Sequence, residues 1–258
     1  MDLRGKVTIV TGAVGAIGRG ISHTLAGEGM HVVVADLSQD SSNRFAEEIN
    51  ASGGSAVGVA VDVSSTESTL KLVEQTLDKF GQVDALINNA GIIAAASLVD
   101  HTEEDFDRII SVNLKGAFLC AKAVAPHMIK RKIGRIVNVS SVAAKRPGPL
   151  QSAYAASKHG MLGLMQVWCQ ELGPYNITVN TVGPGLVQSQ MWTDHLNPAL
   201  APQFGIDSKG LINTLAQTII PMGRTQTPSD IGEAVAYLCR ADNVSGQTLL
   251  VDGGLAMW

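Results

Sequence analysis

Tyr154 and Lys158 lie four residues apart in the small-residue segment SAYAASK, Ser152–Lys158. In a helix, residues at this spacing are neighbours on one face. An unperturbed tyrosine has a pKa of about 10, and a lysine cation about 4 Å away, at an effective dielectric constant of about 20, would stabilise its phenolate by up to about 4 kcal/mol. The pair therefore predicts a tyrosine whose pKa is lowered toward neutral pH and which exchanges a proton with a substrate. Taken alone, the spacing is more often that of a solvated helix pair.

Two serines support the reactive interpretation. Ser140 and Ser141 come directly after the apolar run 135–139. Side chains at the carboxyl end of a parallel strand point toward the crevice in which open α/β sheets bind ligands. A serine hydroxyl at that place can hold a carbonyl oxygen. With these serines nearby, a reactive Tyr154 is favoured over a solvated helix pair.

A glycine-rich turn, TGAVGAIG over 11–18, follows the first apolar run and precedes a helical pattern. Glycine allows the backbone to approach a pyrophosphate closely, and the helix N-terminus offers it free N–H groups. Asp36 ends the second apolar run, where a carboxylate would accept hydrogen bonds from the adenosine ribose; the alternative is that it caps the next helix. Because its charge would repel a 2′-phosphate, and neither Gly15 nor Leu37 supplies a cation, NAD is favoured over NADP.

These residues need a parallel sheet to bring them together, and the chain has the matching pattern. Seven β-branched runs are strand candidates: 6–10, 31–35, 56–61, 85–88, 135–139, 177–182 and 248–252. Most of them lack in-and-out alternation, as strands do when helices cover both faces. Helical patterns lie between them, at about 16–28, 40–52, 66–80, 103–131, 151–172 and 228–239. The alternation predicts one doubly wound, Rossmann-type α/β domain over residues 1–258, with helices on both faces of a parallel seven-stranded sheet.

One segment breaks this rhythm. Between Val187 and Pro221 the pattern is irregular and contains Trp192 and His195. A long connection without clear structure inside a compact domain is usually functional. We therefore expect a substrate loop at about residues 188–221.

The composition narrows the classes of function. A formal net charge of −4 without a long basic run predicts neither a nucleic acid nor a membrane partner. The cysteines Cys120, Cys169 and Cys239 lack C-x-x-C spacing, and the histidines lack partners at metal-ligand spacing, so no metal is expected. The start of the chain does not fit a signal peptide, and no run reaches the about 18 apolar residues of a membrane span. We expect a cytoplasmic protein with free thiols.

Further motifs are spread along the chain: the Asp62–Val63 pair, NNAG at 88–91, SVNLKG with Asn113, IVNVSS with Ser141, YAASK, GPGLVQS at 183–189, and SGQTLLVDGG near the C-terminus. With TGAVGAIG and Asp36, they resemble the motifs of short-chain dehydrogenases/reductases over essentially the whole length. Two departures are visible: Ala16 replaces the middle glycine of the family turn, and Ser189 replaces the usual threonine but keeps its hydroxyl.

The resemblance implies roles for four reactive residues. Tyr154 would be the acid/base that exchanges a proton with the substrate oxygen, and Ser141 would hydrogen-bond that oxygen. Lys158 would lower the tyrosine pKa and bind the nicotinamide ribose, and Asn113 would anchor a water that passes the proton to solvent. The hydride chemistry would belong to NAD, and the protein would supply position and protonation.

The resemblance also implies a cofactor site. Gly12, Ile17 and Gly18 would line the pyrophosphate, and Asp36 with Leu37 the adenosine ribose. The remaining candidates follow the later strands: Asp62 and Val63 at the adenine, Asn89, Ala90 and Gly91 beside them, and Pro184, Gly185, Val187 and Ser189 toward the carboxamide, with Tyr154 and Lys158 at the ribose. For Asn88 and Asn89, a structural role at the strand end carries more weight than direct cofactor contact.

The pocket residues predict a partly apolar ketone. The substrate candidates are Val142, Gln151, Trp192 and His195. The stretch PGLVQSQMW resembles that of polyol and acetoin or butanediol dehydrogenases of the family, although a sugar alcohol would need more buried donors and acceptors. We therefore expect reversible hydride transfer between NAD(H) and a small or medium secondary alcohol or ketone, with a hydroxyketone ranked first.

Two other functions stay open. A 3-oxoacyl carrier-protein reductase shares fold and proton relay, but it would normally use NADPH and need a basic docking surface. A dinucleotide-binding sensor without turnover is the alternative from another class, and the intact reactive residues disfavour it. The family also implies a homotetramer, packed through the helices predicted at 103–131 and 151–172.

Overall fold

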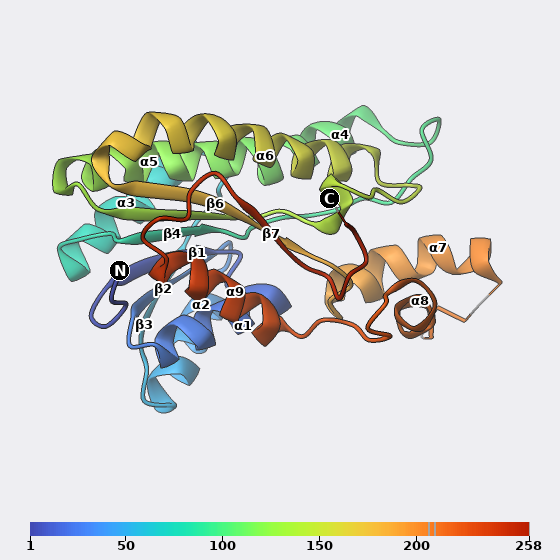
Figure 1. Ribbon diagram of the computed structural model, residues 1–258, viewed down its shortest axis with the longest axis horizontal. Helices are drawn as coiled ribbons and strands as arrows, with labels where there is room; N and C mark the ends of the chain where they lie inside the picture. The colour runs from blue at the N-terminus through green and yellow to red at the C-terminus, as the bar shows by residue number, and fades with distance from the viewer. Residues whose placement is uncertain (206, 209, 258) are drawn as a thin grey trace.

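The seven strands of the computed structural model, which describes residues 1–205, 207–208 and 210–257, form one sheet (Figure 1). The order is β3-β2-β1-β4-β5-β6-β7, and all neighbouring strands are parallel. The strands are β1 Val7–Thr11, β2 His31–Asp36, β3 Ser55–Ala60, β4 Ala85–Asn88, β5 Gly134–Val139, β6 Ile177–Pro184 and β7 Thr248–Val251. The predicted parallel, doubly wound sheet is confirmed.

The central strands are apolar throughout because helices cover both faces of the sheet. Every residue of β1, β4, β5 and β6 is buried. One face carries α1 Ala16–Gly27, α2 Gln39–Ala51 and α9 Pro228–Arg240, and the other carries α3 Thr66–Phe80, α5 Gly116–Arg131 and α6 Ser152–Leu172. Two apolar cores, one on each face, hold these layers against the sheet.

The strand order reverses between β1 and β4. The chain leaves β1 for β2 and β3 on one side, and β4 pairs with β1 on the other side. Open α/β sheets bind ligands in the crevice beyond the carboxyl ends of the strands at such a reversal. The glycine-rich turn follows β1 and the NNAG segment begins at the last residue of β4, so both lie at this crevice.

The predicted helix 103–131 is a continuous helical run with a change of pitch. It consists of α4 Glu103–Ile110, the π-helical turn η1 Ser111–Lys115, and α5. By length and composition this run could cross a membrane, but half of its most apolar 18-residue window is buried within the fold, and core helices pass the same test. The π-helical turn holds Asn113, and such turns occur frequently at functional sites.

The expected substrate loop contains more regular structure than the sequence predicts. It forms the π-helical η4 Met191–Leu196 and the helices α7 Asn197–Phe204 and α8 Leu211–Ile219; residues 206 and 209 lie outside the described part of the chain. Leu211, Ile212 and Leu215 of α8 pack in a third apolar core with Tyr154 and Leu186. A helix as short as α8 is not stable by itself and is hard to predict from the sequence. Packing against this apolar core stabilises it.

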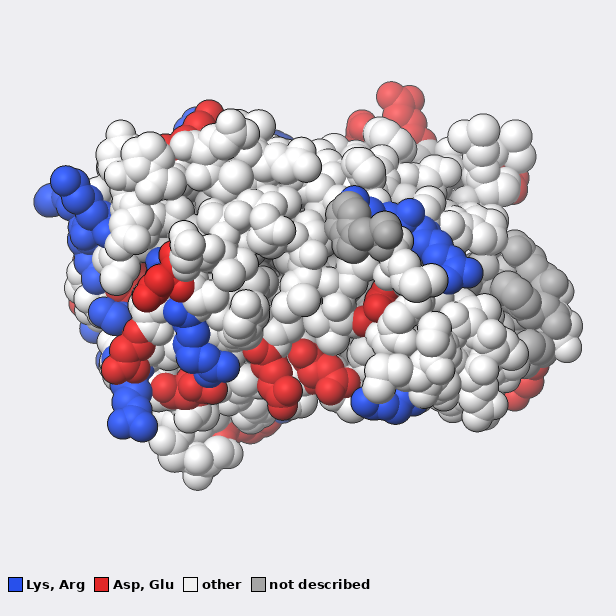
Figure 2. All heavy atoms as spheres, viewed as in Figure 1, with Lys and Arg blue, Asp and Glu red and all other residues white. Residues whose placement is uncertain are grey.

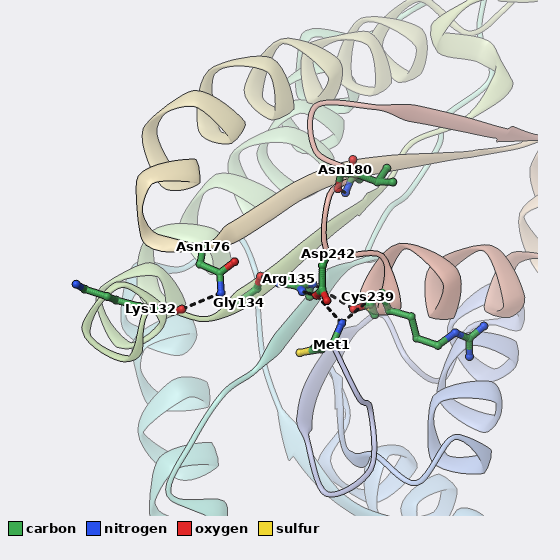
Figure 3. A network of polar contacts seen from close by, with 10 residues as sticks. Met1, Lys132, Gly134, Arg135, Asn176, Asn180, Cys239 and Asp242 are labelled. Atoms are coloured by element: carbon green, nitrogen blue, oxygen red, sulfur yellow. Dashed lines mark hydrogen bonds and ion pairs between the residues drawn. The ribbon is translucent and has the colours of Figure 1, made fainter.

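Arg135 lies near the start of β5, at the end of the strand away from the crevice, and joins β5 to α9 (Figure 3). Its side chain is almost fully buried, and its Nε donates to the carbonyl of Cys239 at 3.1 Å. Nη1 donates to the Gly134 carbonyl at 2.8 Å, and Nη2 pairs with the carboxylate of Asp242. The guanidinium thereby satisfies a last-turn carbonyl of α9 and positions this helix on the sheet.

Candidate active site

Ser141 and Tyr154 meet where β5 ends and α6 begins. Ser141 follows β5 and caps the short 3₁₀ helix η2 Val142–Ala144, with its Oγ accepting the Ala143 N–H at 3.1 Å. Tyr154 lies in the first turn of α6 and is buried. Their side chains share a hydrogen bond. The two residues that the sequence proposes to hold and protonate one substrate oxygen are therefore neighbours.

The electrostatics of Tyr154 differ from the sequence-based expectation. Burial raises the pKa of Tyr154, because desolvation penalises the phenolate, and the hydrogen bond from Ser141 is what lowers it. The predicted lowering by Lys158 is wrong for this arrangement. The Lys158 Nζ lies 5.7 Å from the centroid of the tyrosine ring and donates to the carbonyl of Val139 at 2.9 Å. Tyr154 is therefore a neutral phenol at neutral pH.

Lys158 occupies a buried position one turn further along α6. Its side chain is 3% exposed, and burial lowers its pKa to about 8. Ser140 anchors this turn, because its Oγ donates to the Lys158 carbonyl at 2.7 Å. At Gly91, an added Cβ would lie 3.2 Å from the Lys158 Nζ. The missing side chain at Gly91 thus leaves room for the ammonium group.

Asn113 holds the segment after β4 against α6. Its Oδ1 accepts the Ile92 N–H at 2.8 Å, and its Nδ2 donates to the Ile92 carbonyl at 2.9 Å and to Ser157 Oγ at 3.0 Å. Ser157 Oγ in turn donates to the Tyr154 carbonyl at 2.7 Å. Sequence reasoning missed Ser157, although its place three residues after Tyr154 puts it on the same helix face. The water-anchoring role of Asn113 stays a prediction.

The turn after β1 forms a close-packed cradle in which two positions, Gly12 and Gly18, fit only glycine. Gly12 has a φ of 61°, and an added Cβ would lie 2.8 Å from the Ala90 Cα. A Cβ on Gly18 would lie 2.2 Å from the Gly12 carbonyl oxygen. Helix α1 begins at Ala16 without a side-chain cap, so its first N–H groups are available to an anion. These features fit the pyrophosphate of a dinucleotide, and the helical position of Ala16 accommodates its methyl group.

Asp36 points its carboxylate back to this turn. It accepts the Val14 N–H at 3.0 Å and the Leu37 N–H at 2.8 Å. Helix α2 is capped by Ser38, which accepts the Ser41 N–H at 3.2 Å. The alternative in which Asp36 caps this helix is therefore wrong. A fixed carboxylate at the end of β2 fits a pair of ribose hydroxyls, and Leu37 is an exposed apolar neighbour without a charge.

The residues after β3 and β4 complete the crevice at the carboxyl ends of the strands. The Asp62 carboxylate accepts from the N–H and hydroxyl of Ser64 at 2.9 and 2.6 Å, and Val63 is buried. Asn89 Nδ2 donates to the carbonyls of Thr11 and Gly12, each at 2.9 Å. This amide therefore ties the first turn to the end of β4, as the structural interpretation of Asn89 expects.

Thr11 is a second residue that sequence reasoning missed. Its Oγ1 accepts the N–H groups of Asn89 and Ala90, both at 3.1 Å, and donates to the Ile87 carbonyl at 3.3 Å. The hydroxyl thus sets the path of the backbone that leads to Gly91. The signal in the sequence is a polar residue at the last position of a buried strand.

The end of β6 forms another wall of the site. Pro184, Gly185, Val187 and Ser189 line the same cavity as Tyr154. A Cβ on Gly185 would lie 2.4 Å from Gln226 Oε1, and Gln226 donates its N–H to the Leu186 carbonyl at 2.9 Å. Gln226 lies far away in the sequence, and no sequence pattern pointed to its role in positioning this wall.

These walls enclose a cavity of about 250 Å³, with Ile17 of the glycine-rich turn at its border. Val142, Gln151 and Trp192 line it, as expected of substrate residues. His195 does not line it, and this prediction is wrong. The turns of η4 direct Trp192 and Leu196 inward and leave His195 exposed. Other lining residues were not predicted, among them Arg146, Leu186, Leu200, Leu215, Ile219 and Leu255.

The comparisons with known proteins agree with this geometry. The 3-oxoacyl-[acyl-carrier-protein] reductase of Thermotoga maritima is 36% identical over 259 residues and covers 100% of both chains. A variant of actinorhodin polyketide ketoreductase with NADPH superposes with a TM-score of 0.94, at 32% identity and 98% coverage of each chain. The 3-ketoacyl-(acyl-carrier-protein) reductase from Brucella melitensis, complexed with NADH, gives 0.88, at 33% identity and 99% and 100% coverage. The sequence model of the short chain dehydrogenases matches residues 6–198, and the chain belongs to this family of oxidoreductases.

Proposed function

We propose that this protein is an NAD(H)-dependent ketoreductase of 3-oxoacyl thioesters. The sequence alone ranks a small hydroxyketone first and the 3-oxoacyl reductase second. The relatives reverse this order, because both the Thermotoga maritima and the Brucella melitensis proteins are named as reductases of such acyl groups. The Met191–Trp192 pair, which lines the cavity, keeps the hydroxyketone as the second candidate.

One observation carries the proposal. Ser141 and Tyr154 share a hydrogen bond at the wall of a cavity that is otherwise lined mainly by apolar side chains. An apolar cavity with a few convergent polar groups suits a ketone with an apolar chain, because the polar groups fix the carbonyl and the walls bury the rest. The two hydroxyls then define which carbon reacts.

The proton chemistry follows from the raised pKa of Tyr154. As a neutral phenol it donates its proton to the carbonyl oxygen when negative charge develops there, while the Ser141 hydroxyl holds the same oxygen. A bound nicotinamide would supply the hydride. Lys158, whose pKa of about 8 keeps it mainly cationic at neutral pH, would donate hydrogen bonds to the nicotinamide ribose.

The cofactor preference rests on Asp36. Its carboxylate is fixed by the N–H groups of Val14 and Leu37, so it cannot turn away from a ribose at this place. A 2′-phosphate would be repelled by it. The two structural relatives differ in their bound cofactor, NADPH in one and NADH in the other, so we propose NAD on the strength of Asp36.

A homotetramer and a cytoplasmic location complete the proposal. Helices α4, α5 and α6 expose Phe106, Phe118 and Val167, each more than 40% accessible. Exposed large apolar side chains on neighbouring helices support contacts with further copies of the chain. Size-exclusion chromatography with light scattering would test this state.

The activity is tested with acetoacetyl-coenzyme A, acetoacetyl carrier protein and acetoin, each with NADH and with NADPH, by following oxidation of the reduced nicotinamide. We expect the thioesters to exceed acetoin in kcat/KM and NADH to exceed NADPH. Tyr154→Phe should lower kcat by about 10²–10⁴-fold and retain NADH binding. A wild-type protein that binds NADH and reduces none of these ketones would instead be a dinucleotide sensor.

A further inference from the structure

Arg146 lies at the open side of the substrate cavity. It is the one charged residue among the described residues that line this cavity. Arg146 and the following Pro147, Gly148 and Pro149 are exposed, whereas Ser140 and Tyr154 are buried. The Tyr154 hydroxyl therefore lies further inside the cavity and the guanidinium at its mouth.

The described part of the chain positions the guanidinium and offers it no carboxylate partner. Arg146 Nη1 donates to the Leu255 carbonyl at 2.5 Å, and Leu255 itself lines the cavity. Five other arginines form ion pairs with carboxylates, namely Arg19, Arg108, Arg131, Arg135 and Arg240. Within the described part of the chain, Arg146 forms no such pair. A guanidinium carries five N–H donors, so its charge and most of its donors remain available to an anion.

The segment that holds Arg146 is itself fixed. The buried carboxylate of Asp252 accepts the N–H groups of Gly254 and Ala256, at 3.0 and 2.8 Å. These bonds curl the C-terminal segment so that the Leu255 carbonyl faces Arg146. A side chain that is already oriented loses less conformational entropy when it binds a ligand.

We propose that Arg146 binds an anionic group of the substrate, a phosphate or a carboxylate, while the keto group lies against Ser141 and Tyr154. The inference rests on the proposed ketoreductase function and adds a substrate class: a ketone that carries an anion remote from the reacting carbonyl. Two sources share this chemistry. The thioester carrier can supply a phosphate, or a dicarboxylic acyl chain can supply a carboxylate, and bidentate binding by arginine suits both.

The test compares three substrates with matched reactive groups. Acetoacetyl-N-acetylcysteamine is a neutral thioester, acetoacetyl-coenzyme A adds phosphates, and 3-oxoadipyl-N-acetylcysteamine adds a carboxylate at the end of the acyl chain. Each is assayed with NADH and the wild type, R146Q, R146K and K145Q. The last variant removes an adjacent charge from a residue outside the cavity lining.

We expect R146Q to raise KM for one of the anionic substrates by about tenfold, to leave its kcat within about twofold, and to leave the neutral thioester unchanged. R146K should restore part of the affinity because it keeps the charge. The substrate that responds identifies the source as phosphate or carboxylate. Because Arg146 also holds the Leu255 carbonyl, a purely structural role would affect the neutral thioester as much as the others.

Three results would overturn the inference. The first is an equal rise in KM for neutral and anionic substrates in R146Q, and the second is an unchanged KM for all three substrates. The third is a rise in KM in K145Q as large as that in R146Q, which would point to non-specific attraction by positive charge at the cavity mouth. In each of these cases the wild type still reduces the thioesters, so the proposed function is not affected. Failure of the wild type to reduce any of the three thioesters would overturn the proposed function instead.

Discussion

The Lys158 ammonium group donates to the carbonyl oxygen of Val139, 2.9 Å away at the end of β5. This bond ties α6 to the sheet and satisfies a cation that is almost fully buried. It also directs the charge to the backbone rather than to the phenol of Tyr154. The pKa of Tyr154 is therefore set by burial and by Ser141.

The buried lysine predicts an unusual pH dependence of stability. Its pKa is lowered to about 8 from 10.5, so between these values the folded protein binds fewer protons at this site than the unfolded chain does. The contribution of Lys158 to the free energy of unfolding should therefore rise with pH over this window, by up to about 3 kcal/mol. Below pH 8 both states are charged and the contribution is constant.

Chemical denaturation of the wild type and Lys158→Met between pH 7.5 and 10 measures this difference. Lys130→Met, at an exposed position of α5, is the control. Parallel stability curves for the wild type and Lys158→Met would contradict the prediction. Tyr154 has the opposite effect: its pKa is raised in the folded protein, so at high pH the unfolded chain ionises first and stability falls. Comparing the two proteins removes this shared effect.

The glycine-rich turn predicts contrasting effects of two neighbouring substitutions. Gly18→Ala would place a Cβ 2.2 Å from the Gly12 carbonyl oxygen and 2.7 Å from the Ala13 Cα, so the helix and the turn must separate. We expect a loss of about 2 kcal/mol in stability and weaker NADH binding. Gly15→Ala meets only the Gly12 oxygen at 3.5 Å and has a φ of −67°.

Gly15→Ala should therefore change stability by less than about 1 kcal/mol. Thermal unfolding with and without NADH distinguishes the two variants. A Gly18→Ala protein with wild-type stability and NADH affinity would show that the turn can relax, which would remove the argument that the cradle needs glycine here.

We predict that the Asp36 carboxylate sets the preference for NADH over NADPH. Asp36→Asn keeps an oxygen that accepts the Val14 or Leu37 N–H but removes the charge. We expect the Kd for NADH to rise by about tenfold, because neutral acceptors bind hydroxyls less strongly, and the preference for NADH over NADPH to shrink. Fluorescence titration with both cofactors measures this.

Asp40→Asn, in the first turn of α2, is the matched control, since it removes an equal charge only four residues further along the chain. An unchanged ratio of NADH to NADPH affinity in Asp36→Asn would assign the cofactor preference to other residues.

Arg135 predicts a stability effect remote from the site. Arg135→Met removes the donors to the Cys239 and Gly134 carbonyls and leaves them in a buried place. We expect a loss of about 1–3 kcal/mol, the usual cost of unsatisfied buried acceptors. Arg240→Met breaks a pair with Glu28 whose partners are 46% and 38% exposed, and should cost less than about 1 kcal/mol.

Urea denaturation gives both values, and equal losses in the two variants would contradict the role assigned to Arg135. Since Asp242 is exposed, its loss of a partner adds little to the difference. The Tyr154–Ser141 pair lies at the other end of β5, so we expect kcat of Arg135→Met to stay near that of the wild type in the folded fraction.

The sequence by itself determined the sheet, because each strand is a short β-branched run whose apolar residues face helices on both sides. It also identified Ser141, Tyr154 and the glycine-rich turn, since these depend on spacing along one strand end or one helix. Helix α8 escaped prediction, because its stability comes from packing Leu211 and Leu215 against distant residues.

Only the tertiary structure decided the electrostatics and the shape of the site. The pKa of Tyr154 depends on burial and on where Lys158 finds an acceptor, and neither follows from a spacing of four residues. Arg146 lines the cavity because its guanidinium is held by the Leu255 carbonyl of the C-terminal segment. His195 does not line the cavity, because the turns of η4 leave its side chain exposed. Such contacts join residues far apart in the chain, and only folding brings them within reach.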